Sequence, residues 1–140
     1  MHKDLSNLFF HLTRKLLQEH TALWQEKMPF LTKQQFAVLS AVHAQPGIEQ
    51  LDLMEAALSS KATLAELLVR MERKGLINRA EGKKDKRRRF ITLTVQGEEM
   101  LKTAAPIAER VDSHFLNRLE KNEQNDIISL LKIMLKKPVS

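Results

Sequence analysis

The sequence has 140 residues, a length that suits one domain and allows a hydrophobic core. It contains no cysteine, which excludes disulfides, thiolate zinc sites and cysteine nucleophiles. The formal net charge is +6, from 23 basic and 17 acidic side chains. No secretory signal and no run of ~20 apolar residues for a membrane span is visible, so we expect a cytoplasmic protein.

The positive charge is concentrated in one segment. Residues 70–89 hold ten basic and three acidic side chains, a net charge of +7. A solvated loop and a binding site for a polyanion both explain such a run by itself. The elements around the run must therefore decide between them.

A long amphipathic helix is predicted over Leu5–Lys27, and Pro29 ends it. Its apolar side chains form two stripes, roughly a third of a turn apart. The first stripe holds Leu5, Leu8, Phe9, Leu12, Leu16 and Leu23, and the second holds Phe10, Leu17 and Trp24. Two stripes on one helix indicate two packing partners, its own domain and another subunit.

Three shorter helices are predicted next. The first covers Lys33–Ala44 with Thr32 as its N-cap, and Pro46-Gly47 follows it. The second covers Ile48–Ala57. Its expected buried side chains are Leu51, Met54 and Leu58. The third begins at the Ser59-Ser60 cap, runs to Lys74 and ends before a C′ glycine, Gly75; its inward side chains are Leu64, Leu67, Leu68 and Met71.

The basic run itself is predicted to be a β-hairpin. Leu76–Glu81 and Phe90–Thr94 show the partial alternation of short strands, and residues 82–88 join them. A second long helix follows over Gln96–Leu119, with a kink expected at Pro106. A last helix runs from about Asn122 to Lys136, with Ile127, Leu130, Leu131 and Met134 at helical spacing.

A helix, a turn, a second helix and a basic hairpin together make a winged helix-turn-helix, so the fold class is mainly α with a small β-hairpin wing. The N-terminal side chains of a helix in the major groove reach base edges, and an arginine at a hairpin tip can enter the adjacent minor groove. The helix that begins at Ser60 is therefore the candidate recognition helix.

The residues also resemble a known family. The matching motifs are Pro46-Gly47-Ile48-Glu49-Gln50, Ser60-Lys61-Ala62-Thr63-Leu64, the run from Arg70 to Arg79, Asp85-Lys86-Arg87-Arg88 and Leu93-Thr94-Val95-Gln96-Gly97. In this order and at this spacing, over about residues 31–100, the chain resembles the MarR family of bacterial transcriptional regulators.

The resemblance implies a homodimer that reads a pseudo-palindromic DNA operator. It implies a winged-helix lobe over residues 31–95 and a dimerisation lobe made of residues 1–28 and 96–140. It also implies a repressor that a small aromatic or phenolic effector, bound in the crevice between the lobes, releases from DNA. Arg87 matches the minor-groove arginine of the wing. Asp85 would orient Arg87, pair with Arg70, or serve only as a turn residue.

The expected DNA contacts lie on the recognition helix and the wing. They are Ser60, Lys61, Ala62, Thr63, Ala65, Glu66, Arg70, Lys83, Lys84, Asp85, Lys86, Arg87 and Arg88. Glu66 departs from the family pattern, which often has a basic or hydroxyl residue there. Its carboxylate either accepts a hydrogen bond from cytosine N4, or faces solvent or pairs with Arg70.

Candidate effector contacts lie on the first helix. His20 and Trp24 could meet an aromatic ring, Arg14 could bind a carboxylate, and Thr13 lies between the stripes. The alternatives are that Trp24 belongs to the core, that His20 is an interface histidine and that Arg14 forms a surface ion pair.

Nothing in the sequence indicates an enzyme. The histidines at positions 2, 11, 20, 43 and 114 lack metal-ligand spacing, no glycine-rich phosphate loop is present, and Ser113-His114 next to Asp112 does not make a triad. We therefore expect neither a cofactor nor a metal. Two other functions stay open: a module that binds nucleic acid without sequence preference, and a winged helix used for protein–protein contact.

Overall fold

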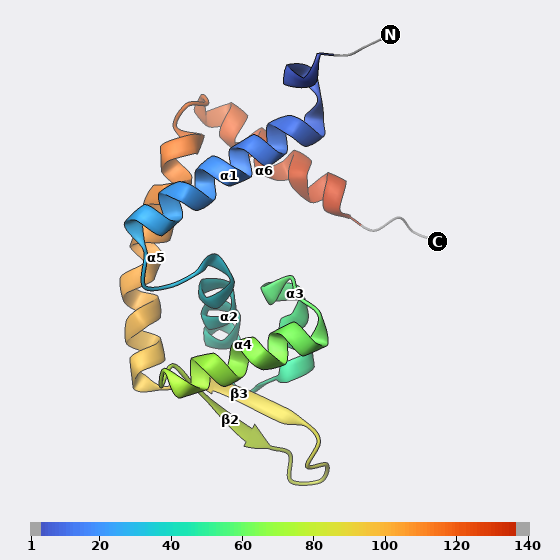
Figure 1. Cartoon of the computed structure of the whole chain (residues 1–140), viewed down its shortest axis with the longest axis vertical. Coiled ribbons are helices and arrows are strands. Elements are labelled where there is room, and N and C mark those ends of the chain that lie inside the picture. The colour runs from blue at the N-terminus through green and yellow to red at the C-terminus, as the bar shows by residue number, and fades with distance from the viewer. Residues whose placement is uncertain (1–3, 137–140) are drawn as a thin grey trace. The chain divides into compact units, whose positions relative to one another are not determined.

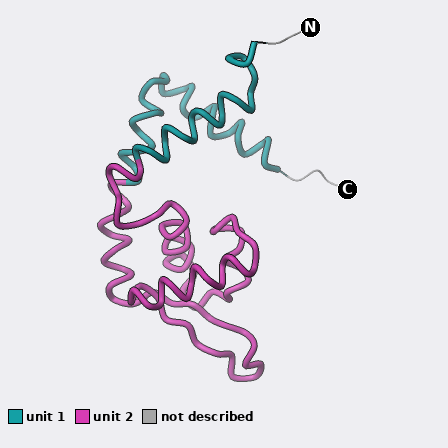
Figure 2. Tube along the Cα trace, in the orientation of Figure 1, with its two compact units in different colours: residues 1–23, 108–140 teal, residues 24–107 magenta. Residues whose placement is uncertain are grey.

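The computed structural model describes residues 4–136. His2 and the outermost residues of the predicted dimerisation lobe, 1–3 and 137–140, lie outside this range. The chain forms two compact units: residues 24–107 make one, and residues 1–23 with 108–140 make the other (Figure 2). No helix within the described range is long and apolar enough to span a membrane.

The unit of residues 24–107 contains the winged helix-turn-helix (Figure 1). Its elements are α2 (Lys33–Ala44), β1 (Ile48–Glu49), the 3-10 helix η2 (Gln50–Leu53), α3 (Met54–Ala57), α4 (Lys61–Arg73), β2 (Ile77–Glu81), β3 (Arg89–Leu93) and the first part of α5 (Val95–Leu116). The fold class predicted from the sequence is confirmed, with one addition. The sheet has three antiparallel strands in the order β1-β3-β2, not two.

The third strand corrects the helix predicted over Ile48–Ala57. Ile48 pairs with Ile91 of β3, so the segment begins as a strand and becomes helical only from Gln50. The predicted burial was also wrong for two side chains. Leu51 is 48% exposed and Leu58 is 89% exposed, whereas Leu53 is fully buried. η2 is a 3-10 helix with three residues per turn instead of the ~3.6 of an α-helix, so Leu53 faces the core in place of Leu51.

Capping residues set the helix boundaries as the sequence predicts. Thr32 accepts a hydrogen bond from the Gln35 backbone N–H, and the Gln35 side chain accepts one from the Thr32 N–H, which forms a complete capping box at the start of α2. Gly75 has a left-handed backbone (φ +76°) after α4. The core of the unit is apolar and includes Val38, Leu39, Val42, Leu53, Leu64, Leu68, Met71 and Ile91.

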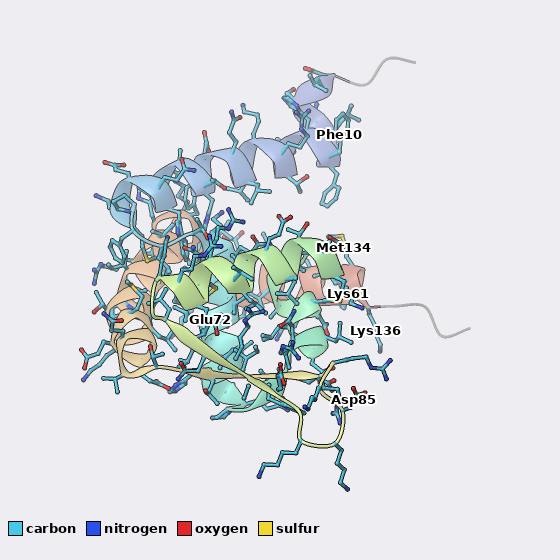
Figure 3. All side chains as sticks on the ribbon, turned by 60° about the horizontal axis from the view of Figure 1, so that its bottom comes forward. Phe10, Lys61, Glu72, Asp85, Met134 and Lys136 are labelled. Atoms are coloured by element: carbon cyan, nitrogen blue, oxygen red, sulfur yellow. The ribbon has the colours of Figure 1, made fainter. Side chains whose placement is uncertain are left out.

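The other unit is entirely helical within the described residues. It contains η1 (Leu5–Asn7), most of α1 (Phe9–Lys27), the second part of α5 and α6 (Lys121–Leu135). The single helix predicted over Leu5–Lys27 is therefore interrupted at Leu8, which is extended. Pro106 lies inside α5. Many apolar side chains of α1 and α6 are exposed, among them Phe10 (53%) and Met134 (58%), which are labelled in Figure 3.

Candidate nucleic-acid interface

The N-terminus of α4 is fixed by Ser60. The Ser60 Oγ accepts a hydrogen bond from the Thr63 backbone N–H at 3.2 Å, and its hydroxyl donates one to Thr63 Oγ1 at 3.0 Å. This N-cap satisfies a backbone donor that the first helical turn would leave unpaired. The first turn therefore begins at a defined residue, with its side chains in fixed directions.

α4 is strongly amphipathic. Leu64, Leu67, Leu68 and Met71 are buried, as the sequence predicts. The opposite face is exposed and includes Ser60, Lys61, Ala62, Thr63, Glu66 and Arg70, while Ala65 is half-buried. The buried side chains anchor the helix against the sheet and α3, so the exposed face is held rigidly.

The wing is the hairpin of β2 and β3. Its strands pair from Ile77 with Leu93 to Glu81 with Arg89, and the loop is closed by a hydrogen bond from the Gly82 N–H to the Arg88 carbonyl, 3.0 Å long. Glycine is required at position 82. A Cβ there would lie 2.5 Å from the Asp85 carbonyl oxygen.

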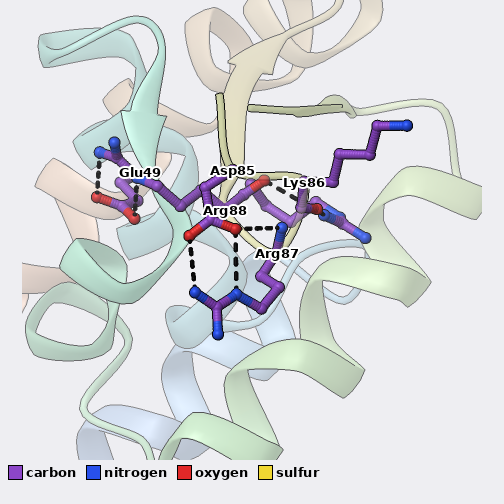
Figure 4. Close-up of polar contacts among 6 residues, drawn as sticks. Glu49, Asp85, Lys86, Arg87 and Arg88 are labelled. Atoms are coloured by element: carbon purple, nitrogen blue, oxygen red, sulfur yellow. Dashed lines mark hydrogen bonds and ion pairs between the residues drawn. The ribbon is translucent and has the colours of Figure 1, made fainter. Parts of the chain in front are cut away.

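Asp85 holds the guanidinium group of Arg87 (Figure 4). Arg87 Nε and Nη2 each donate to one oxygen of the Asp85 carboxylate at 3.1 Å, and the Arg87 backbone N–H donates to the same carboxylate at 3.0 Å. The Arg87 side chain remains 91% exposed. Its hydrogen bonds, the side-chain ones first, lower the pKa of Asp85, and the Asp85 carboxylate raises the pKa of Arg87. The structure thus pairs Asp85 with Arg87 and not with Arg70.

Three other arginines of the basic segment also pair with acids. Arg79 pairs with Glu72 at 3.1 Å, Arg88 with Glu49 at 2.9 Å and Arg89 with Glu81 at 3.7 Å. In contrast, several basic side chains have no ion pair within residues 4–136. They are Lys61, Arg70, Lys83, Lys84 and Lys86. The charge that is free to meet an anion is therefore carried mainly by lysines.

α4 and the wing meet at one surface. A hollow of about 310 Å³ is lined by Lys61 of α4 together with residues of β1, η2 and the wing. The remaining lining residues are Glu49, Gln50, Leu51, Asp85, Arg87, Arg88 and Arg89. Two of the lining residues, Lys61 and Asp85, are labelled in Figure 3. Glu66 is exposed on α4 and, in the part of the chain that is described, has no ion pair with Arg70.

The candidate effector residues divide between the two units. In the helical unit, the Thr13 hydroxyl donates to backbone carbonyls of its own helix, Arg14 is exposed, and His20 Nε2 lies 2.7 Å from Asp112 Oδ1. In the winged-helix unit, Trp24 is 6% exposed and its Nε1–H donates to the Leu31 carbonyl at 2.8 Å. Their role in effector binding stays a prediction.

A groove in the winged-helix unit was missed by the sequence analysis. It has a volume of about 520 Å³, and its lining residues are Phe36, Ser40 and His43 of α2 with Glu98, Glu99, Leu101, Lys102 and Ala105 of α5. His43 Nδ1 lies 2.9 Å from Glu98 Oε2 at one end. On both helices the lining residues recur at helical spacing, which is the signal that could have revealed the groove. No group of three potential metal ligands lies together among residues 4–136.

Comparison with known proteins decides the family. The sequence model of the MarR family matches residues 31–88, and the Escherichia coli O157:H7 transcriptional regulator HosA is 51% identical over 94% of this chain and 97% of its own length. The chain belongs to the MarR family. It is therefore a MarR-family transcriptional regulator and not an enzyme.

Other relatives agree with this assignment. The Pseudomonas putida repressor NicR is 28% identical over 94% of this MarR-family chain and 85% of its own length. The resemblance predicted from the motifs is confirmed. The runs His20–Gln25 and Lys61–Glu66 further indicate a HosA-like member, which the identity to HosA supports.

Solved structures have the same fold. The Bordetella bronchiseptica regulator BpsR, described with regulation of its DNA binding by 6-hydroxynicotinic acid, has a TM-score of 0.91 and 27% identity, covering 99% of this chain and 100% of that one. The Streptomyces coelicolor regulator PcaV, in complex with its natural ligand, has a TM-score of 0.84 and 29% identity over 96% of each chain. The Staphylococcus aureus MepR–DNA complex has a TM-score of 0.83 and 26% identity over 91% and 96%.

Proposed function

We propose that this MarR-family regulator is a homodimeric repressor that binds a specific DNA operator and is released from it by a small aromatic acid or phenol. The observation that carries the DNA-binding part is the surface that the exposed N-terminal face of α4 shares with the basic wing. A helix and an arginine-bearing hairpin on one surface suit adjacent major and minor grooves of B-DNA. The similarity to MepR, solved with DNA, supports this reading.

The exposed apolar side chains of the helical unit support a dimer. They are Leu5, Phe9, Phe10, Leu12, Leu16 and Leu17 before or on α1, and Ile128, Leu130, Leu131, Ile133, Met134 and Leu135 on α6. A soluble protein rarely leaves so many large apolar side chains in water on a few elements. A second copy of the chain would bury them, and two winged helices would then match the two halves of a palindrome.

Selection from random DNA followed by affinity measurement tests the proposal. The selected duplex should bind at least ~10³ times more tightly than random DNA, with a palindromic pattern. Lys61→Gln and Thr63→Ala should each weaken binding. Lys121→Gln on α6 removes the same charge as Lys61→Gln outside the surface, and should leave affinity unchanged.

Two other outcomes would favour the other functions. Equal affinity for all sequences with a steep salt dependence would indicate a non-specific nucleic-acid module. No binding to any DNA would leave protein–protein contact as the function of the winged helix. If Lys61→Gln and Thr63→Ala have no effect on specific binding, α4 is not the recognition helix.

The groove between α2 and α5 is our proposed place for the aromatic ring. Its volume of about 520 Å³ lies within the usual range of small-molecule sites, and Phe36 and Leu101 supply an apolar base. Lys102 and Ser40 lie in the lining without another polar partner among the described side chains. An ammonium and a hydroxyl beside an apolar base suit an aromatic carboxylate, the class to which the BpsR ligand 6-hydroxynicotinic acid belongs.

A thermal-shift series with hydroxybenzoic, hydroxycinnamic and hydroxynicotinic acids tests the effector. At least one acid should raise the unfolding temperature of the wild type and weaken its binding to the operator. Lys102→Gln should abolish the shift, whereas Lys121→Gln should retain it. Loss of the shift in Arg14→Gln or His20→Gln alone would move the site to the residues predicted on α1. Absence of any shift would overturn the aromatic-acid proposal.

A further inference from the structure

Glu49 and Arg88 form a two-pronged ion pair at the base of the wing (Figure 4). Arg88 Nε donates to Glu49 Oε1 and Arg88 Nη2 donates to Glu49 Oε2, both at 2.9 Å, across 39 residues of sequence. Paired hydrogen bonds between a guanidinium and a carboxylate fix the relative orientation of both groups as well as their distance. The pair is thus more restrictive than a single surface contact.

The sheet register explains why these two side chains meet. Glu49 of β1 lies directly opposite Phe90 of β3. Arg88 precedes Phe90 by two residues, so both side chains point to the face of Glu49. The Arg88 guanidinium also lies over the Phe90 ring, 5.0 Å from its centroid. The Glu49 side chain is only 25% exposed and that of Arg88 52% exposed.

Glu49 lies in β1, which is attached to the core of the winged helix. Its neighbour Ile48 is 7% exposed and pairs with the fully buried Ile91. The Gly47 N–H donates to the Ile91 carbonyl at 2.8 Å and extends this attachment. A side chain bound to Glu49 is therefore bound to the core of the unit.

Arg88 belongs to the wing loop of the same unit, directly before β3. Its carbonyl accepts the hydrogen bond from Gly82 that closes the wing loop, and its N–H donates to the Asp85 carbonyl at 3.2 Å. It directly follows Arg87. The Glu49–Arg88 pair therefore connects the core to the base of the wing loop, where the Gly82–Arg88 hydrogen bond closes it. Arg87 lies on this loop.

We propose that Glu49 and Arg88 are a positioning pair for the wing, and that Arg88 is not a DNA contact. The pair holds the loop so that Arg87 and the lysines at residues 83, 84 and 86 meet DNA in one orientation. This proposal rests on the proposed DNA-binding function. It makes an acidic residue on a basic surface favourable for binding, although electrostatic repulsion between Glu49 and phosphate acts in the opposite direction.

The proposal is tested by whether Glu49→Gln raises or lowers the affinity for DNA. Glu49→Gln removes a negative charge near DNA, so simple electrostatics expects tighter binding. We expect weaker binding instead, by roughly tenfold, the scale of coupling between contacting charged residues. Arg88→Lys keeps the charge but cannot form the paired hydrogen bonds to Glu49, so it should weaken binding by a similar factor. The double variant Glu49→Gln with Arg88→Lys should show the same loss, because both substitutions break one interaction. Glu55→Gln on α3 is the matched control, because Glu55 is exposed and unpaired among the described residues.

A second readout does not require DNA. Both Glu49→Gln and Arg88→Lys retain every tryptic site of the wing, and limited trypsin digestion should cleave after Lys83, Lys84 or Lys86 faster in these variants than in wild type or Glu55→Gln. Thermal unfolding checks that each variant remains folded. If the wild type binds no DNA, the proposed function fails, and digestion alone still decides whether the pair orders the wing.

Three results would overturn the proposal. Tighter binding by Glu49→Gln would mean that Glu49 competes with phosphate for Arg88. A salt-dependence slope reduced by about one in Arg88→Gln, with Glu49→Gln unchanged, would make Arg88 a phosphate contact. Digestion of both variants at the wild-type rate would mean that the pair does not hold the wing.

Discussion

The Asp85 carboxylate accepts hydrogen bonds from both the side chain and the backbone N–H of Arg87, two residues further along the chain. The backbone hydrogen bond shapes the turn, and the two side-chain bonds fix the orientation of the guanidinium group, while the Arg87 side chain stays 91% exposed. One carboxylate thus sets both the path of the wing loop and the direction of its most exposed arginine. The roles of Arg87 and Asp85 can therefore be tested by separate substitutions.

Arg87→Ala should weaken binding to the selected operator by roughly tenfold or more, because the minor groove loses its guanidinium partner. The oligomeric state should not change, since Arg87 lies in the winged-helix unit. Fluorescence anisotropy and light scattering measure the two properties. An unaltered affinity would exclude the wing arginine from DNA binding.

The Asp85–Arg87 pair should persist through the neutral range and fail only in acid. Arg87 lowers the pKa of Asp85 from its usual 3.8. A lowered pKa in the folded state means that the contribution is fully present above the unfolded value and is lost as pH falls through the folded one. The NMR signal of the Arg87 Nε–H should therefore remain constant from neutral pH down to about pH 5, then shift below the usual pKa. A midpoint near neutral pH would contradict this assignment.

Leu131→Asp should convert the dimer to monomers, because it places a charge among the exposed apolar side chains of α6. Tight operator binding should be lost with it, since one winged helix reads only half a palindrome. Ser129→Asp, two residues away on the same helix and also exposed, provides the matched control. Normal binding by a monomeric Leu131→Asp protein would remove α6 from the dimer interface.

Leu58→Gly should stabilise the protein by ~1 kcal/mol. Leu58 has a left-handed backbone (φ +50°, ψ +48°) at the end of α3, and its side chain is 89% exposed, so little packing offsets the strain. Leu58→Val should do the opposite, because a β-branched residue tolerates this backbone less well. Urea unfolding at one fixed protein concentration measures both. Equal midpoints for the two variants would contradict the strain argument.

Local signals made most of the fold predictable from the sequence. Thr32, Ser60 and Gly75 mark helix ends through contacts within a few residues, and the α4 core side chains follow simple helical spacing. The strand at Ile48 could not be found in this way. Two residues form a strand only because β3 pairs with them, and that pairing spans more than forty residues of sequence.

The sequence predicts which residues belong to the candidate site, but not which of their side chains pair with one another. The basic run indicated a wing, yet Glu49 and Arg88 meet only through the strand register that the sequence analysis missed. The same holds for His20, whose partner Asp112 is 92 residues away. The groove was also not predicted, because its lining residues lie on α2 and α5, two helices that are far apart in the sequence.

In the wing, the arginines form ion pairs that hold the hairpin, whereas the lysines carry charge without such a structural role. Lys83, Lys84 and Lys86 have no ion pair in the described chain, so replacing them leaves the carboxylate–guanidinium contacts intact. Each neutral substitution should remove about one counterion from the salt dependence. The ionic strength at which this regulator leaves DNA can thus be adjusted in steps, through acetylation or substitution, without redesigning the hairpin that carries it.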